Sequence, residues 1–284
     1  MPLTRCLFAT DLHGHADRYE KLFAAVERER PSALLLGGDL LPHPFAQGGP
    51  ADFFAEVLGP GLTDLRRGLG DGYPRVLAIL GNDDPRSAAR ALEDLAGDGL
   101  LEHVHMRCVS LGAFAVLGYA CVPPTPFLLK DWERWDVSRH IEPGCVSPEE
   151  GYRSVPADPS DVRYGTIARD LAGLAGEEDV GRSVLLFHAP PYRTDLDRAD
   201  LDGHTFEHVP LDVHVGSIAI RRFIEEHQPL VTLHGHVHES PRLTGSWREM
   251  IGRTWCLSAA HDGPELALVR LDLEEPSTAT RELI

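Results

Sequence analysis

The chain has 284 residues, of which 43% are hydrophobic and 25% charged, a balance typical of a globular protein and not of a disordered or fibrous one. It carries 44 acidic and 27 basic side chains, a formal net charge of −17, which argues against duplex nucleic acid as a partner. No apolar run approaches the ~18–20 residues that span a bilayer, so no membrane segment is expected.

The opening residues and the cysteines bear on the compartment. The first ten residues are too short for a signal peptide and are followed at once by Asp11 and His13, so no signal peptide is expected. The five cysteines are scattered and form no C-x-x-C pair, which argues against a disulfide framework and a cysteine zinc site. We therefore expect a reducing, cytoplasmic setting.

Strand-like and helix-like segments alternate through the first hundred residues. Short apolar runs predict strands at 3–9, 33–36 and 76–80, and apolar residues at helical spacing predict helices at 16–28, 52–58 and 62–69. Asp84 and Pro85 are typical of an N-cap followed by proline in the first helical position, so a further helix is expected to about residue 95. This order predicts an α/β fold with a mainly parallel sheet.

The pattern changes after residue 100. Strands are expected at 104–109, 114–119, 184–187 and 230–233, and helices at 160–174 and 216–226. Residues 121–159, rich in proline and aromatic side chains, are expected to form an irregular insertion near the active-site rim of a single domain spanning 1–284. Segments 253–258 and 266–273 suggest a β-hairpin-type finish, with frayed residues from 274 onward.

Five short polar clusters each follow a predicted strand. Because ligands bind beyond the carboxyl ends of parallel strands, we expect the clusters to converge on one sheet edge. Their two carboxylates, one amide oxygen and four imidazoles form a mixed nitrogen and oxygen set that suits Mn, Fe or Zn better than Ca or an oxygen-ligated Mg. The clusters are Asp11-Leu12-His13, Gly38-Asp39, Gly81-Asn82-Asp83-Asp84, Phe187-His188 and Gly235-His236-Val237-His238.

Each cluster alone also has an ordinary structural explanation. An Asp-x-His or Gly-Asp is commonly a turn or a helix cap, Asn82 could be a turn residue, and His188 could be a satisfied buried histidine. The order of all five, each at the end of a strand, favours a metal site.

In this order the clusters resemble the motifs of the calcineurin-like metallophosphoesterase superfamily, from Asp11 to His238. The resemblance implies a β-sandwich flanked by helices, in four α/β/β/α layers. It also implies two divalent metal ions and phosphoester hydrolysis by a hydroxide that the two metals activate. Asp39 would bridge the metals, Asp11, His13 and His238 would hold the first, and Asn82, His188 and His236 would hold the second.

The sequence departs from the family pattern at Asp83, where the family usually has a histidine after the asparagine. An aspartate could donate a proton there only if its pKa were strongly raised. Some branches of the superfamily also lack this histidine, and those branches resemble phosphodiesterases rather than broad monoesterases. The expected substrate is therefore a phosphodiester or a small phosphorylated metabolite.

Candidate residues around the substrate follow from this departure. Asp83 and His214 are the catalytic candidates, and Asn82, Arg193 and His214 are candidate substrate contacts. His214 precedes a predicted helix start, where backbone N–H groups favour an anion, although a surface loop position is equally open. His204 and His208 are weaker candidates, and Asp84 is either an orienting residue or a helix cap.

Three other functions remain open on the sequence alone. One is a phosphomonoesterase, including a protein phosphatase. Another is a catalytically degenerate protein that holds metal and only binds. A nuclease is disfavoured, because the chain is acidic and lacks the length for an added DNA-capping domain.

Overall fold

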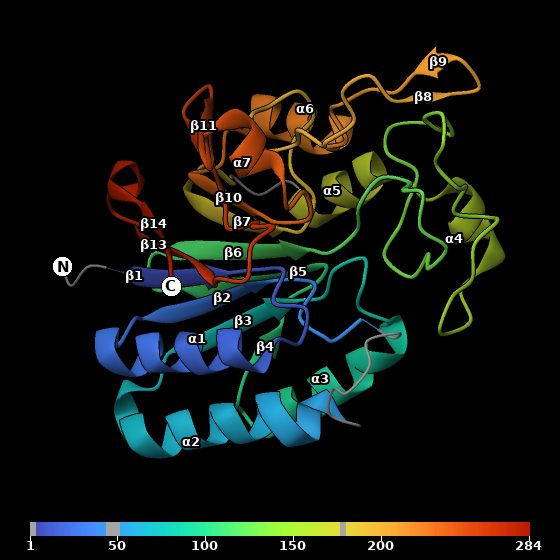
Figure 1. The fold of residues 1–284 in the computed structure, drawn as a ribbon. Helices are drawn as coiled ribbons and strands as arrows, with labels where there is room; N and C mark the ends of the chain where they lie inside the picture. Colours follow the sequence, from blue (N-terminus) through green and yellow to red (C-terminus); the bar gives the residue numbers. More distant parts are fainter. Residues whose placement is uncertain (1–3, 44–51, 177–179) are drawn as a thin grey trace.

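The computed structural model describes residues 4–43, 52–176 and 180–284. Two six-stranded mixed sheets pack face to face, and helices cover the outer face of each (Figure 1). The expected four-layer α/β/β/α sandwich is confirmed. The predicted strand at 3–9 is observed from Arg5, and residue 3 lies outside the described residues.

The first sheet has the strand order β14-β13-β1-β2-β3-β4. Its strands β1 to β4 are parallel to one another. The first three contain continuous apolar runs, because the sheet is covered on both faces. Two antiparallel strands extend it on the β1 side. The strands are β1 (Arg5–Ala9), β2 (Ala33–Gly37), β3 (Arg75–Ile79), β4 (Glu102–His103), β13 (Ala267–Asp272) and β14 (Thr280–Leu283).

The second sheet has the order β11-β12-β10-β7-β6-β5, with a parallel centre and antiparallel edge strands. Two further short strands, β8 (Thr205–Phe206) and β9 (Val209–Pro210), form a separate hairpin that projects from the molecule (Figure 1). The strands of the second sheet are β5 (Arg107–Leu111), β6 (Phe114–Tyr119), β7 (Ser183–Phe187), β10 (Val231–His234), β11 (Arg248–Ile251) and β12 (Thr254–Ser258).

The helices divide between the two sheets. The first sheet is covered by α1 (Ala16–Glu29), α2 (Gly59–Leu69) and α3 (Ala89–Gly97), and the second by α5 (Ile167–Ala175) and α6 (Ile218–His227) (Figure 1). Two short helices, α4 (Pro159–Tyr164) and α7 (Ser240–Thr244), lie in connections. The helices predicted at 52–58 and 62–69 are continuous, because a π-helical turn over Phe54–Leu58 runs directly into α2.

Two predicted elements are each divided in the structure. The strand predicted at 104–109 is replaced by β4 and β5, because the chain turns between them at Met106, which adopts a φ of 56°. The helix predicted at 160–174 is split into α4 and α5. The break occurs because Thr166 is extended and accepts a hydrogen bond from the N–H of Arg169, which starts a new helix.

The prediction for the C-terminal part was wrong in two ways. Strands β12 and β13 lie in different sheets, so they form no hairpin, and β12 pairs instead with β11 and β10. The residues after 274 are not frayed, because β14 pairs along β13 and Ile284 exchanges two backbone hydrogen bonds of 2.9 Å with Leu266.

The predicted capping role of Asp84 is also wrong. Helix α3 begins at Ala89, after a 3₁₀ turn over Arg86–Ala88. The Asp84 carboxylate is fully buried and accepts hydrogen bonds from the N–H groups of Leu40, Leu41 and Gly81. Asp84 therefore ties the loop after β2 to the loop after β3.

Residues 121–158 contain isolated β-bridges but no helix or strand. The segment is nevertheless packed, since Trp132, Trp135, Lys130 and Glu133 are buried in it. None of the five cysteines, all of which lie in the described ranges, forms a disulfide. Within the described ranges, no helix is long and apolar enough to cross a membrane.

Candidate active site

The five polar clusters meet where the two sheets approach each other. Three of them follow β1, β2 and β3 of the first sheet, and two follow β7 and β10 of the second. The expectation of one edge of one sheet therefore needs correction: the carboxyl edges of two sheets form the site together. The seven predicted ligands are brought to this junction.

The backbone around these residues is unusual. Four non-glycine residues here adopt the left-handed region, with φ of 55° at Asp11, 47° at His13, 51° at Asp39 and 71° at His236. Such conformations are costly for residues with a Cβ and concentrate at functional sites. They are held by hydrogen bonds between the loops, including Asp11 N–H to the carbonyl of Gly38 at 3.0 Å.

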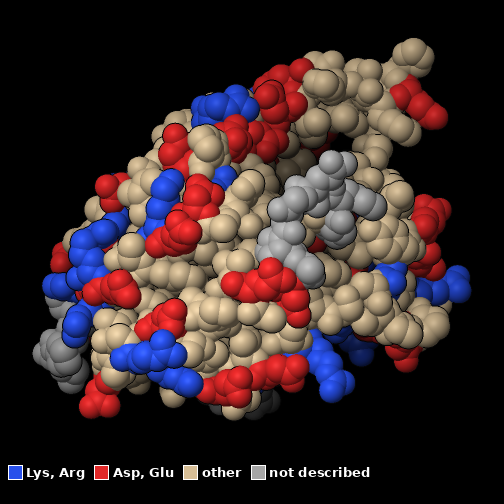
Figure 2. Space-filling view, turned by 60° about the horizontal axis from the view of Figure 1, so that its bottom comes forward, with Lys and Arg blue, Asp and Glu red and all other residues tan. Residues whose placement is uncertain are grey.

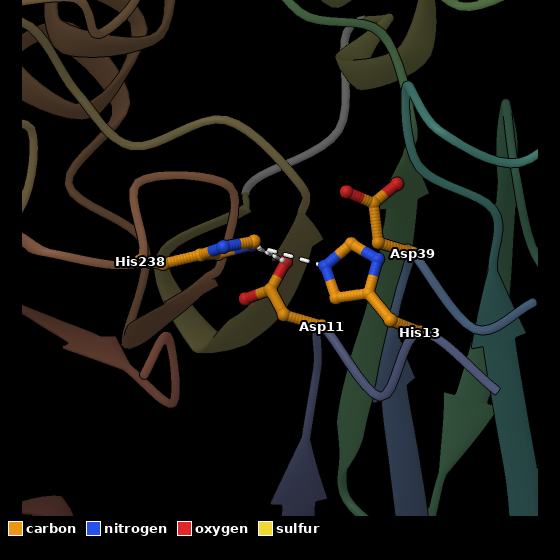
Figure 3. Close-up of side chains that lie close together, drawn as sticks. All are labelled: Asp11, His13, Asp39 and His238. Atoms are coloured by element: carbon orange, nitrogen blue, oxygen red, sulfur yellow. Dashed lines mark hydrogen bonds and ion pairs between the residues drawn. The ribbon is translucent and has the colours of Figure 1, made fainter. Parts of the chain in front are cut away.

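The first group of side chains comprises Asp11, His13, Asp39 and His238, whose ligand atoms all lie within 4.8 Å of one another (Figure 3). The Nε2 atoms of His13 and His238 are 3.1 Å apart, and His238 Nε2 lies 3.4 Å from Asp11 Oδ1. Asp11 Oδ2 is buried without a hydrogen-bond partner. Two facing imidazole nitrogens beside an unpartnered carboxylate oxygen fit a bound cation, which would satisfy all of them.

The second group lies on the other side of Asp39. His188 Nε2 is 3.3 Å from Asp39 Oδ2 and 3.1 Å from Asn82 Oδ1, and the rings of His188 and His236 have centroids 5.3 Å apart. The Nδ1–H of His188 donates to the carbonyl of Gly37 at 2.8 Å. That bond orients the ring so that its Nε2 faces the group, as in histidines that bind metal.

Electrostatics couple the carboxylates and imidazoles. Burial alone would lower the pKa of His188, but Asp39 raises it to about 10, and Asp11 likewise raises the pKa of His238 to about 9 against burial. Burial and the nearby His188 lower the pKa of His236 to about 3. Burial opposes ionisation of Asp39, yet His188 holds its pKa below the usual range. A dication would compete with these protons for the same atoms.

Glycines at the loop ends make room for the ligands. A Cβ on Gly81 would lie 2.3 Å from Asp39 Oδ1 and 2.7 Å from the His188 ring. A Cβ on Gly235 would lie 2.8 Å from Asp11 Oδ2. The glycines before Asn82 and His236 are therefore required by close approach to the ligands.

Asp83 lies beside the metal-site side chains. Its N–H donates to Asp39 Oδ1 at 2.9 Å, and its own Oδ1 accepts from the Asn82 amide at 2.8 Å. Its Oδ2 lies 3.9 Å from His13 Nδ1. Burial, followed by the charge of Asp39, raises the pKa of Asp83.

His214 lines the same cavity as Asp39, Asn82 and Asp83. Its Nδ1 lies 2.8 Å from Oδ1 of Asp197, a fully buried carboxylate that also accepts hydrogen bonds from backbone N–H groups of Arg193, Thr194 and Gly216. Asp197 was not predicted, because no local sequence motif distinguishes it from a surface aspartate.

Other predicted residues lie elsewhere. The Arg193 guanidinium sits over the Tyr192 ring, 5.2 Å from its centroid, and Arg193 is not among the described residues that line the cavity. Its predicted phosphate contact stays a prediction. His204 and His208 are exposed around the β8–β9 hairpin, and neither lines this cavity.

Residues 4–240 match the family model of calcineurin-like phosphoesterases. The chain belongs to this family. It is therefore a hydrolase that acts on phosphoric esters, as the strand-end clusters predicted. No curated protein matches the sequence of this phosphoesterase.

Solved structures share the fold of this phosphoesterase at low sequence identity. A protein of Thermus thermophilus is 18% identical, with 99% of both chains covered and a TM-score of 0.55. A dimetal phosphatase from Danio rerio is 13% identical, with 96% of this chain and 93% of that chain covered and a TM-score of 0.52.

Proposed function

We propose that this phosphoesterase uses two divalent metal ions to hydrolyse a phosphodiester or a small phosphorylated metabolite. The observation that carries this proposal is the convergence of seven predicted ligand side chains from two sheets, six of them around Asp39, with Asp11 Oδ2 left unpartnered. The solved zebrafish relative is named as a dimetal phosphatase, which agrees with the two-metal proposal.

Each half of the site would hold one ion. Asp11, His13 and His238 form one half, Asn82, His188 and His236 form the other, and Asp39 lies between them, near His188 on one side and within the Asp11 group on the other. When bound, two such ions neutralise phosphoryl oxygens and lower the pKa of water towards neutrality. Mn, Fe and Zn all suit this ligand set.

A diester fits the site better than a monoester. Asp83 faces the cavity next to Asp39, so an ionised Asp83 would repel substrate phosphate. A monoester dianion carries twice the charge of a diester monoanion and is repelled more strongly. Asn82 remains the candidate phosphate contact among the ligands.

We assign protonation of the leaving group to His214. Histidine is the side chain that most often transfers a proton to a reacting group in enzymes. The buried Asp197 carboxylate accepts from Nδ1–H of His214, which leaves Nε2 as the atom available to the cavity. Asp83 is the second candidate for this role.

The proposal is tested with bis(p-nitrophenyl) phosphate. We expect hydrolysis that is lost on chelation and restored by Mn²⁺. Asp39→Asn removes the shared charge and should lower the metal content and turnover, whereas Asp64→Asn, an exposed carboxylate on α2, should change neither. Full metal content in Asp39→Asn would contradict the bridging role, and metal binding without turnover would support a degenerate binding protein.

A further inference from the structure

The metal-site residues occupy only part of a much larger cavity. The cavity has a volume of about 580 Å³, the size of pockets that enclose a small organic ligand. Asp39, Asn82 and His236 line it together with residues of the insertion and of the segment 192–218. A phosphoryl group fills only a small fraction of this volume, so the remainder is available to a substituent of the ester.

The walls away from the predicted metal ligands are mostly apolar. The insertion contributes one wall and the segment before α6 contributes the other. Apolar walls gain free energy by covering apolar ligand surface, roughly in proportion to the area that leaves water. The apolar side chains of these walls include Pro123, Pro124, Phe127, Val137, Leu201 and Leu211.

The charged residues of the cavity also favour an uncharged substituent. Among the described residues that line it there is no lysine or arginine. The lining does include Asp136, Glu142, Asp212 and Glu239, in addition to Asp39 and Asp83. A second anionic group on a substrate would meet these carboxylates without a lysine or arginine to pair with it, which is unfavourable in a partly desolvated site.

The apolar surface continues at the edge of the cavity. Phe127 lines the cavity and is 57% exposed, and Phe206 and Val209 of the β8–β9 hairpin are 47% and 50% exposed. The hairpin reaches the insertion, since a Cβ on Gly144 would lie 3.7 Å from the Phe206 ring. In Figure 2 this projecting arm, at upper right, shows tan and red surface without blue.

We propose that the substrate carries a single phosphoryl group esterified to a bulky, uncharged apolar group that occupies this cavity. The inference rests on the proposed function, since the phosphoryl group is placed at the metal residues. It excludes nucleoside polyphosphates and other substrates with several anionic groups. A substituent longer than the cavity would continue over Phe127 and the β8–β9 hairpin.

Binding of non-hydrolysable alkylphosphonates tests this inference without turnover. The metal-loaded protein is titrated calorimetrically with methyl-, butyl- and octylphosphonate, which share one head group. A buried methylene strengthens binding by about fourfold. With part of the chain buried, we expect octylphosphonate to bind at least about 50-fold more tightly than methylphosphonate.

A matched pair of variants tests whether the alkyl chain binds against the apolar wall of the cavity. Leu211→Asn should weaken octylphosphonate binding at least about fivefold and leave methylphosphonate binding within twofold. Met106→Asn, an exposed residue in a left-handed turn that asparagine tolerates, should change neither.

The possible outcomes separate the two proposals. Equal affinities along the series, or ATP binding more tightly than octylphosphonate, would overturn the apolar substrate and leave metal-dependent hydrolysis standing. A clear dependence on chain length in a protein that never hydrolyses a diester would support the apolar cavity and contradict the proposed function.

Discussion

Asp83 stands where the resemblance to the family leads one to expect a histidine, and the structure gives it hydrogen bonds to two ligand residues. Its N–H supports Asp39 and its carboxylate supports the Asn82 amide. The backbone of Asp83 thus orients Asp39 and its side chain orients Asn82, whether or not Asp83 donates a proton.

The ratio of the hydrolysis rates of aryl and alkyl phosphodiesters should show whether a side chain replaces the missing histidine as the general acid. In His214→Ala, which lacks the general acid assigned above, we expect aryl phosphodiesters to be hydrolysed far faster than alkyl ones, because general-acid assistance is typically worth 10²–10⁴-fold. Asp83→His should raise the alkyl rate if the ring is accommodated. Comparable aryl and alkyl rates in the unaltered protein would show that another acid already acts.

His214 is the residue that we expect to supply such assistance. His214→Ala should lower turnover of a poor-leaving-group substrate at least ~10-fold with unchanged metal content. Asp197→Asn should shift the acidic or basic limb of the pH–rate profile, because it alters the partner of His214 Nδ1. Metal analysis and pH–rate profiles are measured for both variants. An unchanged rate in His214→Ala would refute the assignment of His214 as the general acid.

At the scale of elements, the site depends on how closely the loops after β2 and β3 approach each other. Gly81→Ala would place a Cβ 2.5 Å from the backbone nitrogen of Asp39, so the loops must separate. We expect at least tenfold weaker metal binding, measured by competition with a chelator.

Gly173→Ala serves as the matched control for this substitution. A Cβ there meets nothing within 4 Å in α5, so it should stabilise the protein by about 0.5–1 kcal/mol without affecting metal affinity. Equal metal affinity in the two variants would show that the close approach at Gly81 is dispensable.

The insertion is held together by a buried ion pair rather than by regular secondary structure. Lys130 Nζ lies 2.5 Å from Glu133 Oε2 and also donates to the carbonyl of Thr125, while the Thr125 hydroxyl and N–H donate to Glu133. Both charged side chains are fully buried. Thr125 lines the cavity, so the pair fixes part of its wall.

Removing one charge of the Lys130–Glu133 pair should destabilise the folded protein. Glu133→Gln leaves the Lys130 ammonium buried without a counter-charge, which we expect to lower the free energy of unfolding by about 3–5 kcal/mol. Urea denaturation measures the change. Replacing both residues, as in Lys130→Met with Glu133→Leu, should recover much of the loss, and a loss as large in the double variant would assign the effect to packing instead.

At the scale of the whole molecule, acid stability should depend on His234 at the end of β10. Its Nδ1–H donates to the carbonyl of Ala189 and its Nε2 accepts from the Thr232 hydroxyl, in a fully buried position. Burial lowers the pKa of His234 to about 4. The unfolded chain, with a pKa of about 6.5, takes up a proton first as the pH falls.

Because the pKa of His234 is lower in the folded chain than in the unfolded chain, acid lowers the free energy of unfolding. The stabilising effect of a neutral His234 is complete above pH 6.5 and is lost as the pH falls towards 4, by about 2–3 kcal/mol. In urea unfolding of chelated protein at pH 7 and 4.5, His234→Gln should show a smaller loss on acidification than the unaltered chain. An identical pH dependence would contradict this.

The sequence by itself determined the first parallel strands and the strand-end clusters, and hence the ligand candidates; the sandwich was implied by the family resemblance that the clusters carry. These are local signals, because a buried run followed by a polar turn is read from neighbouring residues. Residues 5–9, 33–37 and 75–79 form the expected parallel strands for this reason.

Only the tertiary structure decided which sheet each strand joins, since an apolar run reports burial but not its partner. Strands β12 and β13 therefore separate into two sheets, and β14 is ordered by pairing with β13 rather than by its own apolar content. The same holds for Asp197 beneath His214 and for the apolar cavity beside Asp39. Their walls and contacts come from segments far apart in sequence, which meet only when both sheets have packed.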